Sequence, residues 1–320
     1  MPARVQQLWS TMRALVASPG SASALELREV DEPVPSARQA VVTVRAISLN
    51  RGEVRGLARA QDGARPGWDV AGEVLAAAAD GHGPRAGTRV VGLVDGGAWG
   101  ERVAVATNML AAIPDELSFA AAATLPVAGL TATRALGVAG LHHGSRVLVT
   151  GASGGVGRFA IQLAGHLGAD VTAVVGRTGA GEGLTELGAS SVLVGLPPSG
   201  EREFDIILES IGGESLGTAL SLIAPCGTIV SFGNSSDQPT TFDARTFFPR
   251  SGARLYAFML LPELDRAGGA AHDLAHLAIE MGAGRLDPQI DRQASWREAA
   301  DVVQAMLGRE IHGKAVLTID

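Results

Sequence analysis

The sequence feature that most constrains the fold is a glycine-rich turn between a strand pattern and a helix pattern. Residues 147–150 read Val-Leu-Val-Thr, and the turn follows as Gly151-Ala152-Ser153-Gly154-Gly155-Val156-Gly157. Apolar residues then recur at helical spacing from Val156 to Leu167. Glycines let the backbone turn sharply and approach a diphosphate, whose charge is stabilised by the helix N-terminus. The pattern therefore predicts a dinucleotide-binding turn with contacts from Gly151, Ser153, Gly154, Gly155, Val156 and Gly157.

The residues after this turn alternate between short apolar strands and helical segments. We expect strands at 171–175, 192–194, 204–208, 228–232 and 254–259, and helices near 156–167 and 216–223. Alternation at this spacing is typical of a parallel sheet with helices on both faces. The predicted fold class is α/β, with a doubly wound parallel sheet of the Rossmann type.

The residues before the turn follow a different pattern. Between Arg13 and Val105 the apolar stretches are short, β-branched and separated by Gly, Pro, Asp or Ser, which is typical of an irregular, mostly antiparallel β domain. A helical pattern at 120–136 marks the crossing, and helices near 274–281 and 296–307 precede a strand at 315–319. We expect the β domain at 1–125, with residues 1–11 as a tail, the nucleotide-binding domain at 126–261, and a return to the β domain at 262–320.

The end of the second strand of the parallel sheet indicates which dinucleotide binds. Folds that prefer NAD place an acidic residue there, about 20 residues past the glycine turn, to hold the ribose 2′-hydroxyl. This chain reads Val174-Val175-Gly176-Arg177-Thr178 instead. Arg177, next to Gly176, can attract a 2′-phosphate through charge-assisted hydrogen bonds. The sequence therefore favours NADPH over NADH, with a solvated surface role for Arg177 as the alternative.

Composition points to small molecules as partners. The formal net charge is −7, with acidic and basic residues interleaved, which indicates neither a nucleic-acid nor a membrane surface. We find no uninterrupted apolar run of about 18 residues and no secretion signal, and we expect a cytoplasmic protein. Cys226 is the only cysteine, which excludes an internal disulfide and a multi-cysteine zinc site, and we expect it to be buried.

Two enzyme families share the glycine pattern. Short-chain dehydrogenases place the turn near the N-terminus and need a tyrosine followed four residues later by a lysine. Here the turn begins past residue 145, the only tyrosine is Tyr256, and position 260 is Leu260. The chemistry of that family is therefore excluded.

An ordered series of segments instead resembles the medium-chain dehydrogenase/reductase superfamily, in its zinc-independent quinone oxidoreductase branch. From Met12 onward the series runs through Ile47–Arg51, Pro66–Val74, Gly87–Gly92, Leu125–Ala132, the glycine turn, Ser231–Ser235 and Gly313–Leu317. The resemblance implies a chaperonin-10-like β catalytic domain that is split around the Rossmann domain.

The resemblance also implies which residues line the nicotinamide end of the cofactor. Asn50, Thr131 and Asn234 would do so, because amide and hydroxyl groups orient a carboxamide without competing for the hydride. Phe232, Gly233 and Lys314 complete the expected cofactor-binding set. For Lys314 the alternative of a surface charge at the start of a strand stays open.

An aromatic-rich stretch follows Asn234. Its members could roof an apolar acceptor pocket or form a subunit interface; they are Phe242, Phe247, Phe248, Tyr256 and Phe258. Dimers of the resembled branch extend the Rossmann sheet across a two-fold axis at this place, and an exposed apolar edge strand needs a partner. We therefore expect a homodimer through Arg254–Met259.

The zinc ligands of the superfamily's metal-dependent members are missing from this sequence. Those members carry a cysteine before the first helix and a Gly-His-Glu motif, where this chain reads Ser48-Leu49-Asn50-Arg51-Gly52-Glu53 and Gly67-Trp68-Asp69. Three protein ligands for a catalytic zinc cannot be assembled, so we expect no metal. The acceptor must then take a hydride readily by itself, as a quinone or an α,β-unsaturated carbonyl does.

The candidate catalytic residues are Asn50, Arg55 and Glu53. Many members of the branch carry a tyrosine where Arg55 stands; a guanidinium can stabilise an oxyanion but is a poor acid, so solvent would supply the proton. Glu53 could relay a proton if burial raised its pKa, or it could be a surface carboxylate. Two other functions stay open: a biosynthetic enoyl reductase for a polyketide-like or thioester substrate, and a non-catalytic NADPH-binding protein.

Overall fold

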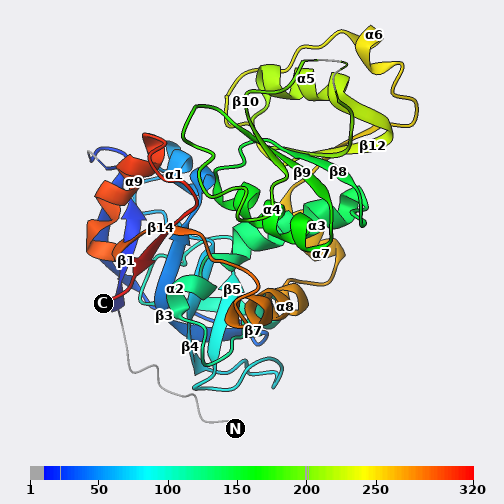
Figure 1. Cartoon of the computed structure of the whole chain (residues 1–320). Helices are drawn as coiled ribbons and strands as arrows, with labels where there is room; N and C mark the ends of the chain where they lie inside the picture. The colour runs from blue at the N-terminus through cyan, green and yellow to red at the C-terminus, as the bar shows by residue number, and fades with distance from the viewer. Residues whose placement is uncertain (1–10, 22, 199, 201) are drawn as a thin grey trace. The chain divides into compact units, whose positions relative to one another are not determined.

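The computed structural model describes residues 11–21, 23–198, 200 and 202–320, drawn as a ribbon in Figure 1. The chain divides into two compact units. The first unit contains Met1–Val127 and Gly268–Asp320, and the second unit contains Ala128–Ala267. Of the predicted tail, 1–11, only Thr11 belongs to the described residues, and it begins the first strand.

The unit boundaries, 127/128 and 267/268, lie two and six residues beyond the predicted ones at 125/126 and 261/262. Val127 stays with the first unit because its backbone N–H donates to Asp69 Oδ1 at 2.9 Å. Residues 262–267 stay with the second unit because helix α7 (Leu260–Arg266) packs on α3 (Leu130–Ala139). The chain therefore returns to the first unit at Gly268.

The second unit is built on a six-stranded parallel sheet. Its strands are β8 (Arg146–Val149), β9 (Asp170–Val175), β10 (Ser191–Val194), β11 (Phe204–Glu209), β12 (Ile223–Ser231) and β13 (Arg254–Ala257). Their order is β10-β9-β8-β11-β12-β13, which is the doubly wound Rossmann order and reverses between β8 and β11. The predicted fold class is confirmed.

The helices of this sheet follow the apolar pattern of the sequence. Helix α4 (Gly155–His166) follows the glycine turn, and α5 (Gly213–Leu222) follows β11. Val147–Val149 of β8 and Phe159–Ile161 of α4 are fully buried, so the strand and the helix pack through the apolar residues that predict them. Residues 176–190, between β9 and β10, form turns instead of a helix.

The first unit is a β domain. A separate pair of strands, β1 (Thr11–Ala17) and β2 (Leu25–Asp31), accompanies a seven-stranded sheet with the order β14-β15-β3-β4-β5-β7, in which β6 also pairs with β3. The members of this sheet are β3 (Gln39–Leu49), β4 (Asp69–Ala76), β5 (Arg89–Leu93), β6 (Arg102–Ala106), β7 (Leu110–Ala112), β14 (Ile290–Ser295) and β15 (Lys314–Thr318). All its pairings are antiparallel except β14 with β15, so the predicted, mostly antiparallel character is confirmed.

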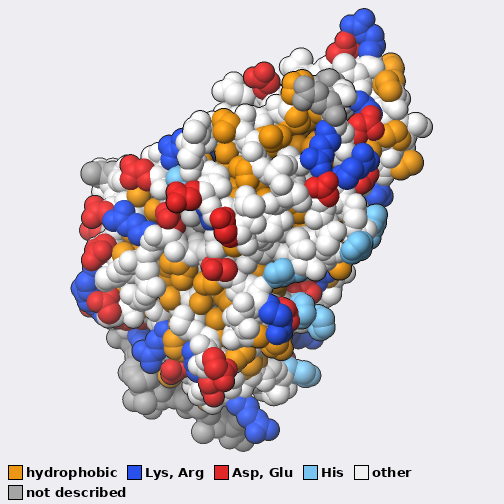
Figure 2. Space-filling view, viewed as in Figure 1, with side chains coloured by type: hydrophobic (Ala, Val, Ile, Leu, Met, Phe, Trp, Pro, Cys, Tyr) orange, Lys and Arg blue, Asp and Glu red, His pale blue; other side chains and the backbone are white. Residues whose placement is uncertain are grey.

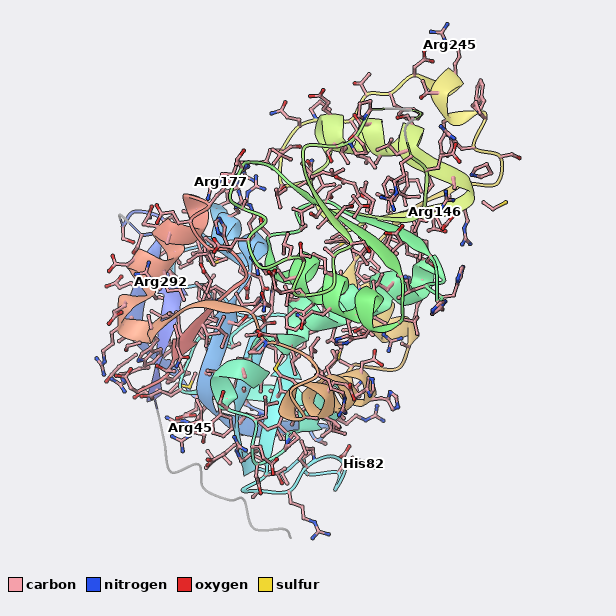
Figure 3. The ribbon with its side chains drawn as sticks, in the orientation of Figure 1. Arg45, His82, Arg146, Arg177, Arg245 and Arg292 are labelled. Atoms are coloured by element: carbon pink, nitrogen blue, oxygen red, sulfur yellow. The ribbon has the colours of Figure 1, made fainter. Side chains whose placement is uncertain are left out.

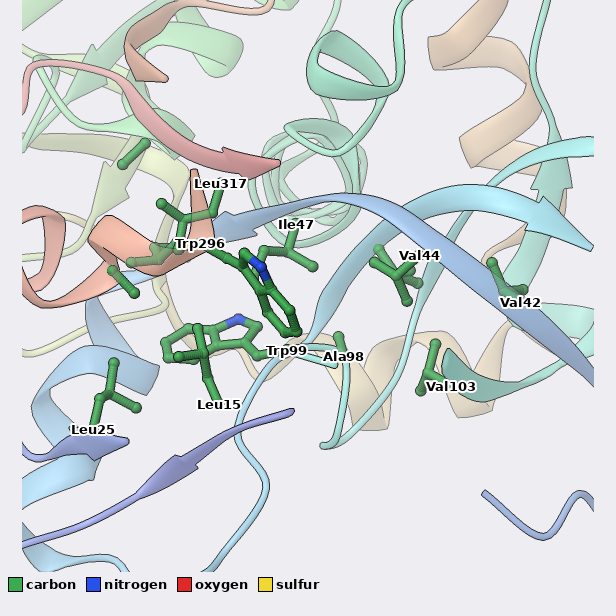
Figure 4. Close-up of a cluster of buried hydrophobic side chains, with 14 of the residues drawn as sticks. Leu15, Leu25, Val42, Val44, Ile47, Ala98, Trp99, Val103, Trp296 and Leu317 are labelled. Carbon is green, nitrogen blue, oxygen red and sulfur yellow. The ribbon is translucent and has the colours of Figure 1, made fainter. Parts of the chain in front are cut away.

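Two buried tryptophans anchor the core of the first unit. Trp99 and Trp296 are 1% and 0% exposed, and Leu15, Ile47 and Leu317 belong to the same cluster (Figure 4). The unit's helices α1 (Arg51–Gly56), α2 (Phe119–Ala122), α8 (Ala271–Gly282) and α9 (Ala299–Leu307) complete it. The short helix α1 follows β3 directly, so its position is fixed by the sheet.

One helical stretch, Phe119–Ala139, is long and apolar enough to cross a membrane by length and composition alone. Because 78% of its most apolar 18-residue stretch is buried inside the fold, it has the character of a core helix. The face of the molecule in Figure 2 shows acidic and basic side chains interspersed, as the sequence predicts. The expected burial of Cys226 is wrong: this residue is exposed and has a φ of +63°.

Candidate functional site

The glycine turn of the second unit admits no larger residue at two of its positions. Gly151 has a φ of +59°, and a Cβ there would lie 2.6 Å from Ser210 Oγ. At Gly157 a Cβ would lie 2.7 Å from the Cα of Ala152. Both distances are far below van der Waals contact, so glycine is required for the turn and for the close approach of α4.

The N-terminus of α4 is open to an anion. Its N-cap residue, Gly154, has no side chain to accept the N–H groups of the first turn, and Gly151, Ser153 and Gly154 are half-buried rather than enclosed. The turn follows β8, at the reversal of strand order where open α/β sheets bind their ligands. These residues fit the diphosphate of a dinucleotide.

A buried carboxylate joins the ends of β8 and β11 beside this turn. Glu209 is 0% exposed and accepts hydrogen bonds from the N–H groups of Ile211 and Gly212, both at 3.0 Å, and from Ser215 Oγ at 2.9 Å. Thr150 Oγ1 accepts the N–H of Ser210 at 3.0 Å. The two strand ends therefore form one rigid edge.

The segment after β12 is brought to the same edge. The N–H of Phe232 donates to Glu209 O at 3.0 Å, and a Cβ at Gly233 would lie 2.9 Å from Ser210 O. Gly212, at a φ of +71°, approaches Asn234 so closely that a Cβ would lie 2.3 Å from Asn234 Oδ1. The predicted cofactor residues Phe232, Gly233 and Asn234 thus share the edge with the glycine turn, while Thr131 is buried on α3.

Arg177 is the second residue after β9. It is exposed and lies at the same carboxyl end of the sheet (Figure 3). A Cβ at the preceding Gly176 would meet no heavy atom within 4 Å, so the space over the strand end is open. Arg146, at the start of β8, marks the opposite end of the parallel sheet (Figure 3). Arg177 therefore lies near the strand end where folds that prefer NAD place an acidic residue.

The first unit contains a buried polar cluster around Asp69. Asp69 is 0% exposed, and its Oδ2 accepts from Ser48 Oγ at 2.8 Å, from Asn50 Nδ2 at 2.9 Å and from Lys314 Nζ at 3.3 Å. Its Oδ1 accepts the N–H of Val127. A buried ionised carboxylate is tolerated only with this degree of pairing.

Lys314 holds the amide of Asn50 from the other side. Its Nζ donates to Asn50 Oδ1 at 2.8 Å and to Leu49 O at 3.4 Å, in addition to Asp69. These contacts account for the three hydrogens of an ammonium group. Lys314 is 2% exposed, so the alternative of a surface charge is wrong. The contacts give it a positioning role toward Asn50, and its predicted contact with the cofactor stays a prediction.

Glu53 is buried as well, so its alternative as a surface carboxylate is also wrong. It is 6% exposed; Oε2 accepts the N–H of Asn50 at 2.7 Å and Oε1 accepts the N–H of Trp68 at 2.6 Å. Burial, and then the negative charge of Asp69, raise the pKa of Glu53 from its ordinary value to about 8. Glu53 thereby caps α1 and ties it to the start of β4.

Arg55 lies half-exposed on α1, four residues after Arg51. Burial, and then the charges of Arg309 and Arg55, lower the pKa of Arg51. This side of α1 therefore carries a positive electrostatic potential.

Comparisons with known proteins agree with this geometry. Residues 190–317 match the family model described as zinc-binding dehydrogenase. The chloroplast envelope quinone oxidoreductase homolog of Arabidopsis thaliana is 29% identical over 321 residues, covering 93% of this chain and 95% of that protein. The structure of a mycobacterial protein complexed with NADPH matches with a TM-score of 0.84 at 22% identity, covering 96% of this chain and 99% of that chain. The chain is thus similar to members of the medium-chain dehydrogenase/reductase superfamily, in its quinone oxidoreductase branch.

Other relatives are much larger proteins that this chain matches over only a part of their length. The spectinabilin polyketide synthase system protein NorB of Streptomyces orinoci is 33% identical over 291 residues, which cover 88% of this chain. This chain spans only 13% of the length of NorB.

The segments where zinc-dependent members of the superfamily carry their ligands lie outside residues 190–317, the range that the zinc-binding dehydrogenase model matches. Across residues 11–21, 23–198, 200 and 202–320, no group of three or more His, Cys, Asp or Glu side chains is placed to hold a metal ion. Trp68 stands where the superfamily's histidine ligand is expected, and in the segment expected to carry the cysteine ligand the amide of Asn50 is held by Asp69 and Lys314.

Four residues, two in the polar cluster of the first unit and two at the sheet edge of the second unit, were not singled out from the sequence. Ser48, Asp69, Glu209 and Arg158 are polar groups at the ends of apolar strands or on the buried face of an apolar helix. A polar or charged residue within an otherwise apolar stretch is the signal that they share, because a buried polar group requires partners.

Proposed function

We propose that this protein is a zinc-independent, NADPH-dependent reductase that transfers a hydride to a quinone or to an α,β-unsaturated carbonyl compound. The observation that carries the proposal is the open glycine turn at the strand-order reversal, combined with an arginine instead of a carboxylate after β9.

The cofactor would be held by residues of the second unit. The diphosphate would be held by the glycine turn, through Gly151, Ser153, Gly154, Gly155, Val156 and Gly157. The 2′-phosphate would be held by Gly176 and Arg177. The nicotinamide end would be held by Thr131, Phe232, Gly233 and Asn234. The mycobacterial relative is complexed with NADPH, which supports the choice of the phosphorylated cofactor. When bound, the cofactor supplies the hydride.

Asn50 is the residue of the first unit whose side chain is best oriented to act on the acceptor. Its Nδ2 carries two hydrogens, of which one is donated to Asp69, and its Oδ1 is fixed by Lys314, so the amide is held in one orientation. The second hydrogen can donate to an acceptor oxygen on which negative charge develops. Arg55 would add electrostatic stabilisation, and solvent would supply the proton.

Glu53 is better suited to support this arrangement than to relay a proton. Both of its oxygens already accept backbone N–H groups, one of them from Asn50 itself. The expected cysteine ligand is missing and an indole, that of Trp68, stands where the histidine ligand is expected, which supports a metal-free reaction.

A second candidate function is enoyl reduction on a polyketide-like or thioester substrate. The similarity to a polyketide synthase protein over 88% of this chain favours it. It uses the same site and the same cofactor and differs only in the acceptor. A non-catalytic, NADPH-binding role is the outcome if no acceptor is reduced.

We also propose a cytoplasmic homodimer. β13 is the last strand in the order of its sheet; Leu255 on it is 49% exposed, and Met259, two residues after it, is 71% exposed. An exposed apolar edge strand favours pairing with a second copy of the same strand.

The test is NADPH and NADH oxidation against three acceptor sets: 1,4-quinones, conjugated enones and enoyl thioesters, each with and without a chelator. We expect chelator-insensitive oxidation of NADPH by one of the sets, and that set names the acceptor class. Loss of activity in the chelator would contradict the metal-free proposal. NADPH binding without turnover in any set would contradict the reductase and support the binding role.

A further inference from the structure

Arg158 connects the two loops that would hold the phosphates of the cofactor. It lies on the first turn of α4 and is 8% exposed. Its Nε donates to Ser153 O in the glycine turn at 3.2 Å, and its Nη2 donates to Glu182 O in the loop after β9 at 3.1 Å. One guanidinium thus holds both loops.

The loop after β9 needs such a connection. Residues 176–190 contain five glycines, Gly176, Gly179, Gly181, Gly183 and Gly188, and form turns. Glycine-rich turns lose more backbone entropy on ordering than a helix of ordinary residues would. The planar, five-donor guanidinium is suited to bind two carbonyl groups at fixed positions.

Packing alone does not explain a cation at this place. The neighbouring residues on the buried face of α4 are apolar, from Phe159 to Ile161, and a positive charge in the first turn opposes the helix dipole. Anions at the same helix end would be stabilised by that charge. The position is therefore unfavourable for the helix by itself and favourable for a phosphate-binding edge.

We propose that Arg158 is a positioning residue that fixes the loop of Arg177 onto the glycine turn, so that the preference for NADPH over NADH depends on Arg158. The inference rests on the proposed cofactor, and it adds a residue that acts through Arg177 rather than by touching the 2′-phosphate.

The experiment is a double-mutant cycle with Arg158→Met and Arg177→Ala, singly and together, in the full chain. The dissociation constants of NADPH and NADH are measured by titration for each variant. Hydrogen exchange of residues 176–190 is measured without cofactor. Arg146→Met is the matched control, because Arg146 pairs with Asp205 at the opposite end of the same sheet.

We expect each single substitution to reduce the NADPH preference about tenfold, which corresponds to roughly 1.4 kcal/mol. The double variant should show about the same preference as Arg177→Ala, because both residues act on one contact. Arg158→Met should also speed exchange in 176–190, and Arg146→Met should change neither quantity. Arg158→Lys keeps the charge but loses the planar fork of donors, so it should give an intermediate preference; it carries the test if the methionine variant does not fold.

The failures are distinguishable. Equal affinity of the wild-type protein for both cofactors would overturn the proposed NADPH preference itself. If Arg158→Met keeps the wild-type preference for NADPH, or loses affinity equally for NADPH and NADH, the role of Arg158 is overturned. The proposed function is unaffected by either result. Additive effects in the double variant would also overturn the role of Arg158.

Discussion

The ammonium of Lys314 lies 2.8 Å from the amide oxygen of Asn50, although 264 residues separate the two in the sequence. The antiparallel pairing of β15 with β3 brings them together, since Ala315 lies opposite Leu49. Both side chains also bind the carboxylate of Asp69. A buried ion pair from distant parts of the sequence therefore helps to orient the candidate catalytic amide.

Removing the charge of Lys314 should destabilise the first unit. Lys314→Met leaves Asp69 buried and without its counter-charge, so we expect the free energy of unfolding to fall by about 3–5 kcal/mol, measured by denaturant titration. The pair Lys314→Met with Asp69→Asn should recover part of the loss, because it removes the second charge as well. A methionine variant as stable as the wild type would contradict an ionised pair.

Asn50→Ala should separate turnover from cofactor binding. Losing one hydrogen-bond donor to a developing oxyanion lowers kcat by about 100-fold, while the dissociation constant of NADPH should stay within about twofold. The matched control is Asn108→Ala, which removes an exposed amide that donates to Gly268 O in the same unit. Turnover at the wild-type rate in the Asn50 variant would remove this residue from the reaction.

Alanine substitutions at two glycines of the second unit, one in the glycine turn and one in α3, should have opposite effects. Gly157→Ala would place a Cβ 2.7 Å from the Cα of Ala152, so we expect loss of stability and of cofactor binding. Gly137→Ala lies in α3 with no heavy atom within 4 Å of its Cβ, so it should stabilise the protein by up to about 1 kcal/mol. Thermal unfolding and NADPH titration measure both; tight NADPH binding by Gly157→Ala would contradict the close approach of α4.

The raised pKa of Glu53 should make the stability of the protein depend on pH. Its pKa is raised in the folded protein to about 8, above the ordinary value of 4.5, so folding binds a proton between these values. The contribution of Glu53 is then most favourable below about pH 4.5 and is lost as the pH rises toward 8. Glu53→Gln should lower the overall stability, because the NH2 group of the new amide faces a backbone N–H donor. The same substitution should remove the dependence of stability on pH that Glu53 causes. An unchanged slope in the variant would assign it to other groups.

The edge strand β13 predicts the oligomeric state. We expect the wild-type protein to sediment as a dimer and Leu255→Glu with Met259→Glu to sediment as a monomer, because charges on an exposed apolar edge oppose pairing. Val194→Glu, on the exposed opposite edge strand β10, is the control and should leave the dimer intact. A monomeric wild-type protein would contradict the proposed assembly.

Local patterns predict the second unit well. β8, the glycine turn and α4 are adjacent in the sequence, so their strand, turn and helix signals are complete within about 20 residues. The strands β2 and β14 were not predicted, because Leu25–Asp31 and Ile290–Ser295 are largely polar and partly exposed. Their pairing depends on partners elsewhere in the chain.

The polar cluster of the first unit could not be assembled from local patterns. Asn50, Glu53 and Lys314 were predicted individually, but their mutual contacts depend on the register of β15 on β3 and of β3 on β4. Asp69, the residue that joins them, lies in an apolar strand and carries no motif of its own. Arg158 was missed for the same reason, since its two partners come from loops 29 residues apart, Ser153 and Glu182.

The place of β15 between β14 and β3 has a consequence for biosynthesis. A ribosome delivers residues 128–267 complete, and this unit can fold while the chain is still being made. The other unit has to wait: until residues 314–318 emerge, β3 keeps an open edge and the carboxylate of Asp69 has no ammonium beside it. Nascent chains stalled before residue 314 should therefore be sensitive to proteases in residues 11–127 while residues 128–267 already resist them.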